Sequence, residues 1–116
     1  EYYSYKWPAG GYLSTPNDLV AFGNALLNEK IVSKNYLHLL FTSQKTNDGK
    51  ETGSGYGFKI GIDSKGRKVI FHGGESEGAR AFLLIYPEEK LVISICANIL
   101  EHLFQKVKQK PLPVIF

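Results

Sequence analysis

Two apolar runs near the end of the chain place the strongest constraint on its fold. Residues 79–86 and residues 91–97 are apolar at most positions, and only residues 87–90 separate them. A connection this short joins antiparallel neighbours, so the pair predicts a β-hairpin. Because both runs are apolar on both of their faces, we expect the sheet that contains them to be covered on both sides.

Two helices are predicted ahead of this hairpin. Apolar residues recur at helical spacing through residues 16–28, after a start signal made of Ser14 or Thr15 and Pro16. A second, short helix is expected after Ser33. Its inward residues would be Tyr36, Leu37, Leu40 and Phe41.

Two further strands and a last helix complete the expected order. After a polar loop at residues 43–55, a half-buried strand is predicted from an alternation of apolar residues, which are Tyr56, Phe58, Ile60 and Ile62. A turn at residues 64–66 leads into a strand at residues 67–72. The final amphipathic helix, which would cover one face of the sheet, is predicted from Ile99, Leu100, Leu103, Phe104 and Val107. Helices flanking an antiparallel sheet of about four strands make the predicted fold α+β.

The chain-level features narrow the class of protein. A length of 116 residues allows one domain at most, and the absence of methionine predicts a processed product or an excised piece of something larger. The net charge of +3 rests partly on lysines after residue 105 and lacks the dense basic stripe of a nucleic-acid binder, so no nucleic-acid partner is expected. Cys96 lies in an apolar run and is expected to be a small core residue. No clustered His/Cys pattern suggests a metal, and we expect neither a metal nor a cofactor.

The strongest candidate for chemistry is His72. It ends the predicted strand at residues 67–72 and is followed by Gly73 and Gly74. A histidine at a strand end can reach a cleft, and its pKa is easily tuned across neutrality. Glycines beside it let backbone N–H groups approach a ligand closely. We therefore predict that this segment forms one wall of an active site, whereas His38 and His102 are expected to be structural or solvated.

A nucleophile is harder to place within these residues. Residues 74–78 match G-x-S-x-G, but a nucleophile elbow at Ser76 would need a helix next, in a parallel sheet, and a strand-like run follows instead. We expect Ser76 to lie in a loop between antiparallel strands, with the elbow as a distant alternative. No serine has a lysine three residues later, and K-T-G is also absent. The attacking group is therefore expected outside this chain.

Four segments together resemble one family, the serine β-lactamase and penicillin-binding-protein superfamily, especially its class C-like esterases and peptidases. Residues 8–27 are similar to its A-G-G-[LY]-x-S-T-x-x-D-[LM]-x-x-F segment, and residues 55–58 to its G-Y-G-[FLW] strand. Residues 72–78 fit H-x-G-x-x-x-G, which replaces K-T-G in many members, and residues 82–98 are similar to its closing hairpin. The resemblance implies that residues 1–116 are a single incomplete domain, the C-terminal part of a β-lactamase-like α/β/α domain.

The resemblance also implies roles for four residues. His72 would stand in place of the K-T-G lysine, near the acyl or carboxylate end of the substrate. Gly73 and Gly74 would keep the strand edge open for the substrate. The backbone N–H of Glu75 would supply one oxyanion-hole donor, and the nucleophile's own N–H the other.

The resemblance further implies acyl transfer on a small acyl substrate, which would be a β-lactam, an ester or a peptide. The serine would lie outside this chain, so these residues alone are expected to be inactive. Resemblance alone favours a periplasmic or secreted location. The alternative is a non-catalytic binding or interaction module on part of the same fold, which would self-associate through an exposed strand edge.

Overall fold

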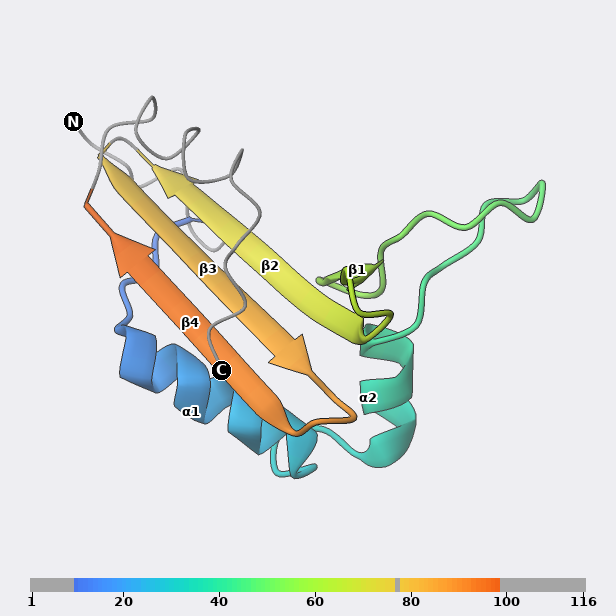
Figure 1. Ribbon diagram of the computed structural model, residues 1–116, viewed down its shortest axis with the longest axis horizontal. Coiled ribbons are helices and arrows are strands. Elements are labelled where there is room, and N and C mark those ends of the chain that lie inside the picture. The colour runs from blue at the N-terminus through green and yellow to red at the C-terminus, as the bar shows by residue number, and fades with distance from the viewer. Residues whose placement is uncertain (1–9, 77, 99–116) are drawn as a thin grey trace.

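The computed structural model describes residues 10–76 and 78–98, and these residues form two helices and one antiparallel sheet (Figure 1). The helices are α1 (Pro16–Leu27) and α2 (Lys34–Leu40). The strands are β1 (Lys59–Ile62), β2 (Lys68–Ser76), β3 (Ala79–Tyr86) and β4 (Leu91–Ala97), in the spatial order β1-β2-β3-β4. The α+β prediction is confirmed. The helix expected after residue 98 lies outside the described residues.

Both helices begin where the sequence predicts. The Thr15 hydroxyl accepts a hydrogen bond from the Asp18 backbone N–H at 3.1 Å, and Pro16 occupies the first turn of α1. In α2 fewer side chains face the core than predicted. Phe41 is buried and Leu37 and Leu40 pack against the core, but Tyr36 is exposed. This seven-residue helix presents only one narrow face to the core, and Tyr36 lies off that face.

The polar loop at residues 43–55 and the turn at residues 64–66 are confirmed, whereas β1 is shorter than expected. Residues 43–57 extend away from the sheet (Figure 1), with Lys45 paired to Glu51 at 3.3 Å. In the predicted alternation, Phe58 and Ile60 pack against the core, but Tyr56 and Ile62 are exposed. The reason is that β1 is an outer strand of four residues, so its flanks pass beyond the area that the core covers.

The core lies between the sheet and α1. Ile70 pairs with Ile85 in the register of β2 and β3, and both are fully buried. They meet Leu26 of α1 together with Phe41 and Leu83. Because α1 packs mainly on β4 and less on β3, the part of β2 on the same face is left without a helix among the described residues.

The described residues cover only this one face of the sheet. On the other face Phe71 and Phe82 stack with ring centroids 5.8 Å apart, but Ile93 and Ile95 of β4 remain 38% and 49% exposed. The expectation of two covered faces is therefore not met in residues 10–98. Cys96 is also exposed rather than buried, because it is the penultimate residue of the outermost strand, where packing is incomplete.

Candidate functional site

The four candidate residues lie together in the second half of β2. The predicted strand ended at His72, but β2 continues to Ser76 because β3 pairs with it throughout. Gly73 lies opposite Phe82 and Gly74 opposite Ala81. A Cβ atom on Gly73 would come within 3.2–3.3 Å of the Phe82 ring, so a larger residue would fit there only if that ring shifted by a few tenths of an ångström. The glycines thus continue the strand instead of ending it.

The backbone of this segment presents hydrogen-bonding groups on the side of β1. The Asp63 N–H donates to the Arg67 carbonyl at 2.9 Å, which points the Arg67 backbone toward β1. Backbone groups of alternate residues in an antiparallel strand point to the same side, so those of Gly73 and Glu75 share this direction. Pairing with β1 ends at Phe71. The segment at residues 73–76 therefore continues beyond the last described strand on that side.

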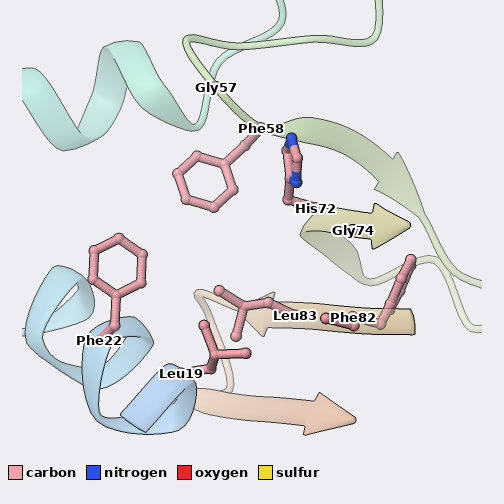
Figure 2. Close-up of a pocket in the computed structure, with 9 residues that line it drawn as sticks. Leu19, Phe22, Gly57, Phe58, His72, Gly74, Phe82 and Leu83 are labelled. Carbon is pink, nitrogen blue, oxygen red and sulfur yellow. The ribbon is translucent and has the colours of Figure 1, made fainter. Parts of the chain in front are cut away.

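His72 borders an apolar pocket of about 340 Å³ (Figure 2). Phe58 lies beside the imidazole, and Leu19 and Phe22 of α1 lie across the pocket. The whole lining comes from α1, the segment before β1, β2 and β3, and consists of Leu19, Phe22, Gly57, Phe58, His72, Gly74, Ala81, Phe82 and Leu83. The imidazole is the one ionisable side chain in this lining. A hydrogen-bonding group in such apolar surroundings can orient a bound polar group.

Glu75 does not line this pocket. Glu75 lies three residues after His72 in β2, and successive side chains of a strand point to opposite faces. The Glu75 side chain therefore lies on the face of the sheet opposite to His72. There its carboxylate Oε1 lies 3.9 Å from Nε of Arg80. The sequence reasoning missed Arg80, although a charged residue inside an otherwise apolar strand was the signal that could have found it.

The structure rules out Ser76 as a nucleophile elbow. Ser76 pairs with Ala79 at the end of the β2–β3 hairpin, and the strand β3 follows it. An elbow needs a strand followed by a helix, and this local geometry is antiparallel throughout. No serine, threonine or cysteine is among the residues that line the pocket.

The other candidate groups are accounted for in the described residues. His38 lies in α2 with its Nδ1 3.0 Å from the Thr42 hydroxyl, as a structural histidine would. His102 lies outside the described residues. Within residues 10–76 and 78–98, no group of three His, Cys, Asp or Glu side chains is arranged to hold a metal ion, and no helix is long and apolar enough to cross a membrane.

Comparisons with known proteins bear on the family and the fold of the chain. The family model described as Beta-lactamase matches residues 1–111. Among solved structures, the chain is similar to a D-stereospecific amidohydrolase from Streptomyces sp., with a TM-score of 0.58 and 23% sequence identity. The match covers 72% of this chain and 25% of the amidohydrolase, so the chain spans about a quarter of that structure's length. No curated protein matched the sequence.

Proposed function

Since the chain belongs to the β-lactamase family, we propose that it forms one wall of the active-site cleft in a serine hydrolase, whose attacking serine lies on polypeptide outside these 116 residues. The observation that carries the proposal is the position of His72. Its imidazole is the single ionisable group of an apolar pocket, and the lining contains no nucleophile. Such a wall can orient a substrate but cannot by itself form an acyl-enzyme. In this view residues 1–116 are one incomplete domain.

The pocket suggests where the missing serine would be held. Leu19, Phe22 and Phe58 surround a hollow on the face of β2 that α1 leaves uncovered. Exposed apolar surface of this kind usually marks a place where another element packs. We expect the segment that carries the nucleophile to pack here, with its hydroxyl beside His72. The amidohydrolase structure, about four times as long as the matched region, has room for such a segment.

The proposed chemistry follows from the groups that this wall presents. A base outside these 116 residues takes the serine proton and returns it to the departing alcohol or amine, while the serine oxygen attacks the carbonyl carbon of an ester or amide and the carbonyl oxygen becomes an oxyanion. The N–H of Glu75 and the nucleophile's own N–H donate hydrogen bonds to this oxygen, and loss of one such donor typically lowers turnover by about 10²–10³-fold. His72 hydrogen-bonds the acyl or carboxylate end of the substrate.

The two glycines support access to this wall. Gly73 lets the Phe82 ring pack against the strand from the opposite face. A Cβ atom on Gly74 would lie 3.7 Å from the Ala81 Cβ, an ordinary contact, so packing alone does not demand glycine there. Its absence of a side chain instead leaves the pocket side of the β2 backbone open to a substrate.

The second candidate function is a non-catalytic interaction module. The observation that favours it is the outer strand β4, where Ile93 and Ile95 are exposed. An edge strand with apolar side chains can add a strand or a second copy of the chain. In that case the hollow beside His72 would serve packing only.

The test is covalent trapping in the protein encoded by the complete reading frame. The protein is mixed separately with a p-nitrophenyl ester, a penicillin-type β-lactam and a D-amino-acid amide. The amide is included because the similar solved structure is a D-stereospecific amidohydrolase. Intact-mass and peptide mass spectrometry then locate any acyl adduct. We expect the adduct on a serine outside these 116 residues, with none on the 116-residue chain expressed alone.

Two results would contradict the proposal. An adduct on Ser76 would return the nucleophile to this chain. The absence of both adduct and turnover with all three compounds would favour the interaction module.

A further inference from the structure

Arg80 is a charged side chain buried behind the proposed cleft wall. It is 8% exposed, and it is the one charged residue in the buried set of the described residues. Arginine is almost never buried to this extent without partners. Arg80 lies on β3 directly opposite Glu75, on the face of the sheet that is turned away from His72. It therefore does not line the pocket, and any influence on the site must pass through the strands.

The guanidinium of Arg80 holds the end of the β2–β3 hairpin. Its Nη1 donates hydrogen bonds to the carbonyl of Ser76, the last residue of β2, and to that of Ala79, the first residue of β3, the latter at 2.8 Å. Its Nε lies 3.9 Å from the Glu75 carboxylate and has no hydrogen-bond partner among the described residues. One planar cation thus contacts three residues at the hairpin end, two on β2 and one on β3. The planar guanidinium fork, which lysine lacks, places Nη1 between the two carbonyls and Nε beside the Glu75 carboxylate.

The end of β2 pairs with β3 on one side and has no described partner strand on the other. β1 supports the strand only as far as Phe71, and Gly73 and Gly74 follow. Glycines leave the backbone more freedom than any other residue. On the far side of these glycines lies the N–H of Glu75, which is the proposed oxyanion donor. Its distance from His72 depends on how firmly the hairpin end is held.

We propose that Arg80 is a positioning residue: by tying Ser76, Ala79 and Glu75 together from behind the sheet, it fixes the Glu75 N–H relative to His72. The inference rests on the proposed function, because the N–H matters only if an oxyanion forms there. A displacement of about 1 Å in a catalytic donor can cost about 10²-fold in rate. Arg80 thus acts on turnover without touching the substrate.

The test uses the protein encoded by the complete reading frame, with Arg80→Met and Arg80→Lys as variants. The matched control is Arg67→Met at the opposite end of β2. Arg67 also forms an ion pair, with Asp63 at 2.7 Å, and lies over the Tyr86 ring, but it is far along the strand from Glu75. Three quantities are measured: kcat and KM for an ester, the midpoint of chemical unfolding, and the hydrogen-exchange rate of the Glu75 amide relative to that of Val69.

We expect Arg80→Met to lower kcat by about 10–10²-fold with little change in KM, because a transition-state contact is lost rather than substrate binding. The Glu75 amide should exchange faster while the Val69 amide does not. Arg80→Lys keeps the charge but not the fork, so it should recover only part of both effects. Arg67→Met should lower the unfolding midpoint without changing kcat or Glu75 exchange.

The results separate this inference from the proposed function. If the wild-type protein turns over no substrate, the proposed function fails, and Glu75 exchange alone decides on Arg80. Unchanged Glu75 exchange in folded Arg80→Met would overturn the positioning role, as would an unchanged kcat in an active protein. If Arg80→Met does not fold, the same two readouts on Arg80→Lys decide.

Discussion

At the scale of single residues, His72 combines an exposed imidazole with apolar neighbours that have no competing polar groups. Phe58 lies beside it, and Leu19 and Phe22 lie across the pocket (Figure 2). The side chain makes no contribution to the buried core, which is formed by Ile70 and Ile85 on the same face. A role in folding therefore does not explain why a histidine stands at this position. A role in binding does, because the imidazole can form a hydrogen bond in the pocket.

We predict that His72→Ala in the complete protein lowers kcat by about 10²-fold, the scale typical of losing a positioned hydrogen-bonding group. Its free energy of unfolding should change by no more than about 0.5 kcal/mol, as for other exposed positions. Steady-state kinetics and urea unfolding measure the two effects. His38→Ala is the control, since His38 lies in α2 outside the pocket and should leave kcat unchanged. A His72→Ala protein that unfolds readily yet keeps full kcat would make His72 a structural residue.

The sequence could single out His72 and its glycines as candidates, but it could not show which residues surround them. The pairing of His72 with following glycines is visible in the sequence, but it predicts a strand end at His72, whereas β2 continues to Ser76. Phe22 and Phe58 reach the pocket from elements far away along the chain, and no spacing rule connects them with His72. Arg80 was missed because its contacts depend on which backbone carbonyl groups lie at the end of the hairpin. The pairing register of β2 and β3 decides this, and the sequence does not show the register.

At the scale of elements, the contact of α1 with β4 depends on a missing side chain. Gly23 is buried, and a Cβ atom placed on it would come within 2.6 Å of a Val92 methyl carbon. Val92 is β-branched and has few alternative rotamers, so it cannot easily move aside. The glycine is thus required by close approach, although it weakens the helix itself.

We predict that Gly23→Ala destabilises the protein by about 1–3 kcal/mol, because overpacking outweighs the gain in helix propensity. The control is Asn24→Ala at the adjacent exposed position, which should be neutral or slightly stabilising. Chemical unfolding of both variants gives the comparison. A stabilised Gly23→Ala protein would mean that α1 can shift away from β4 at no cost.

The turn between β1 and β2 is held by a carboxylate. Asp63 accepts hydrogen bonds from the backbone N–H of Arg67 at 2.9 Å and of Lys65 at 2.8 Å, and it pairs with the Arg67 guanidinium. These contacts, led by the backbone N–H of Arg67, hold the pKa of Asp63 below its ordinary value of 3.8. A carboxylate with a lowered pKa in the folded state stabilises the fold above its unfolded pKa. That stabilisation is lost as the pH falls through the lower, folded pKa.

We therefore predict that the free energy of unfolding of the wild-type protein decreases as the pH falls below about 4, and that Asp63→Asn flattens this decrease. At neutral pH the same variant should be less stable than the wild type, because the ion pair with Arg67 is gone. Urea unfolding across this pH range measures both. Glu88→Gln, which removes a carboxylate from the other hairpin connection, serves as the control. A pH dependence identical in Asp63→Asn and wild type would show that other groups produce it.

The elements themselves were predictable where local signals agree with packing. The short connection at residues 87–90 between two apolar runs fixed β3 and β4, and the capping signal at Thr15 fixed the start of α1. The predicted end of β2 was wrong: the glycines after His72 suggested that the strand stops there, but β3 pairs with β2 as far as Ser76. The predicted burial of alternate residues along β1 was partly wrong, because an alternating pattern cannot show that a strand lies at the edge of a sheet.

At the scale of the whole molecule, the described residues form one sheet, two helices and a pocket that His72 borders. The sheet carries α1 on one face (Figure 1), and the pocket beside His72 lies next to that helix (Figure 2). The fold class could be predicted because each helix and strand has its own local sequence pattern, and these patterns give the order of the elements. The residues that would complete the proposed site could not be predicted, since the proposal places them outside these 116 residues.

The outer strand β4 leads to a prediction for the 116-residue chain expressed alone. Leu91, Ile93 and Ile95 are partly exposed on its face opposite α1, and β4 ends the described sheet. Apolar side chains along an edge strand favour pairing with a second copy. We expect sedimentation velocity to show a reversible increase in mass with concentration.

The variant Ile93→Lys should weaken this association about tenfold or more, since burying a charge in such an interface costs at least 1.4 kcal/mol. Ile62→Lys is the matched control: it makes the same substitution on β1, at the opposite side of the sheet, where Ile62 is 68% exposed. If both variants weaken association equally, the contact is not specific to β4. A wild-type chain that stays monomeric at every concentration would remove the interaction module as a competitor, because its only structural support is this strand.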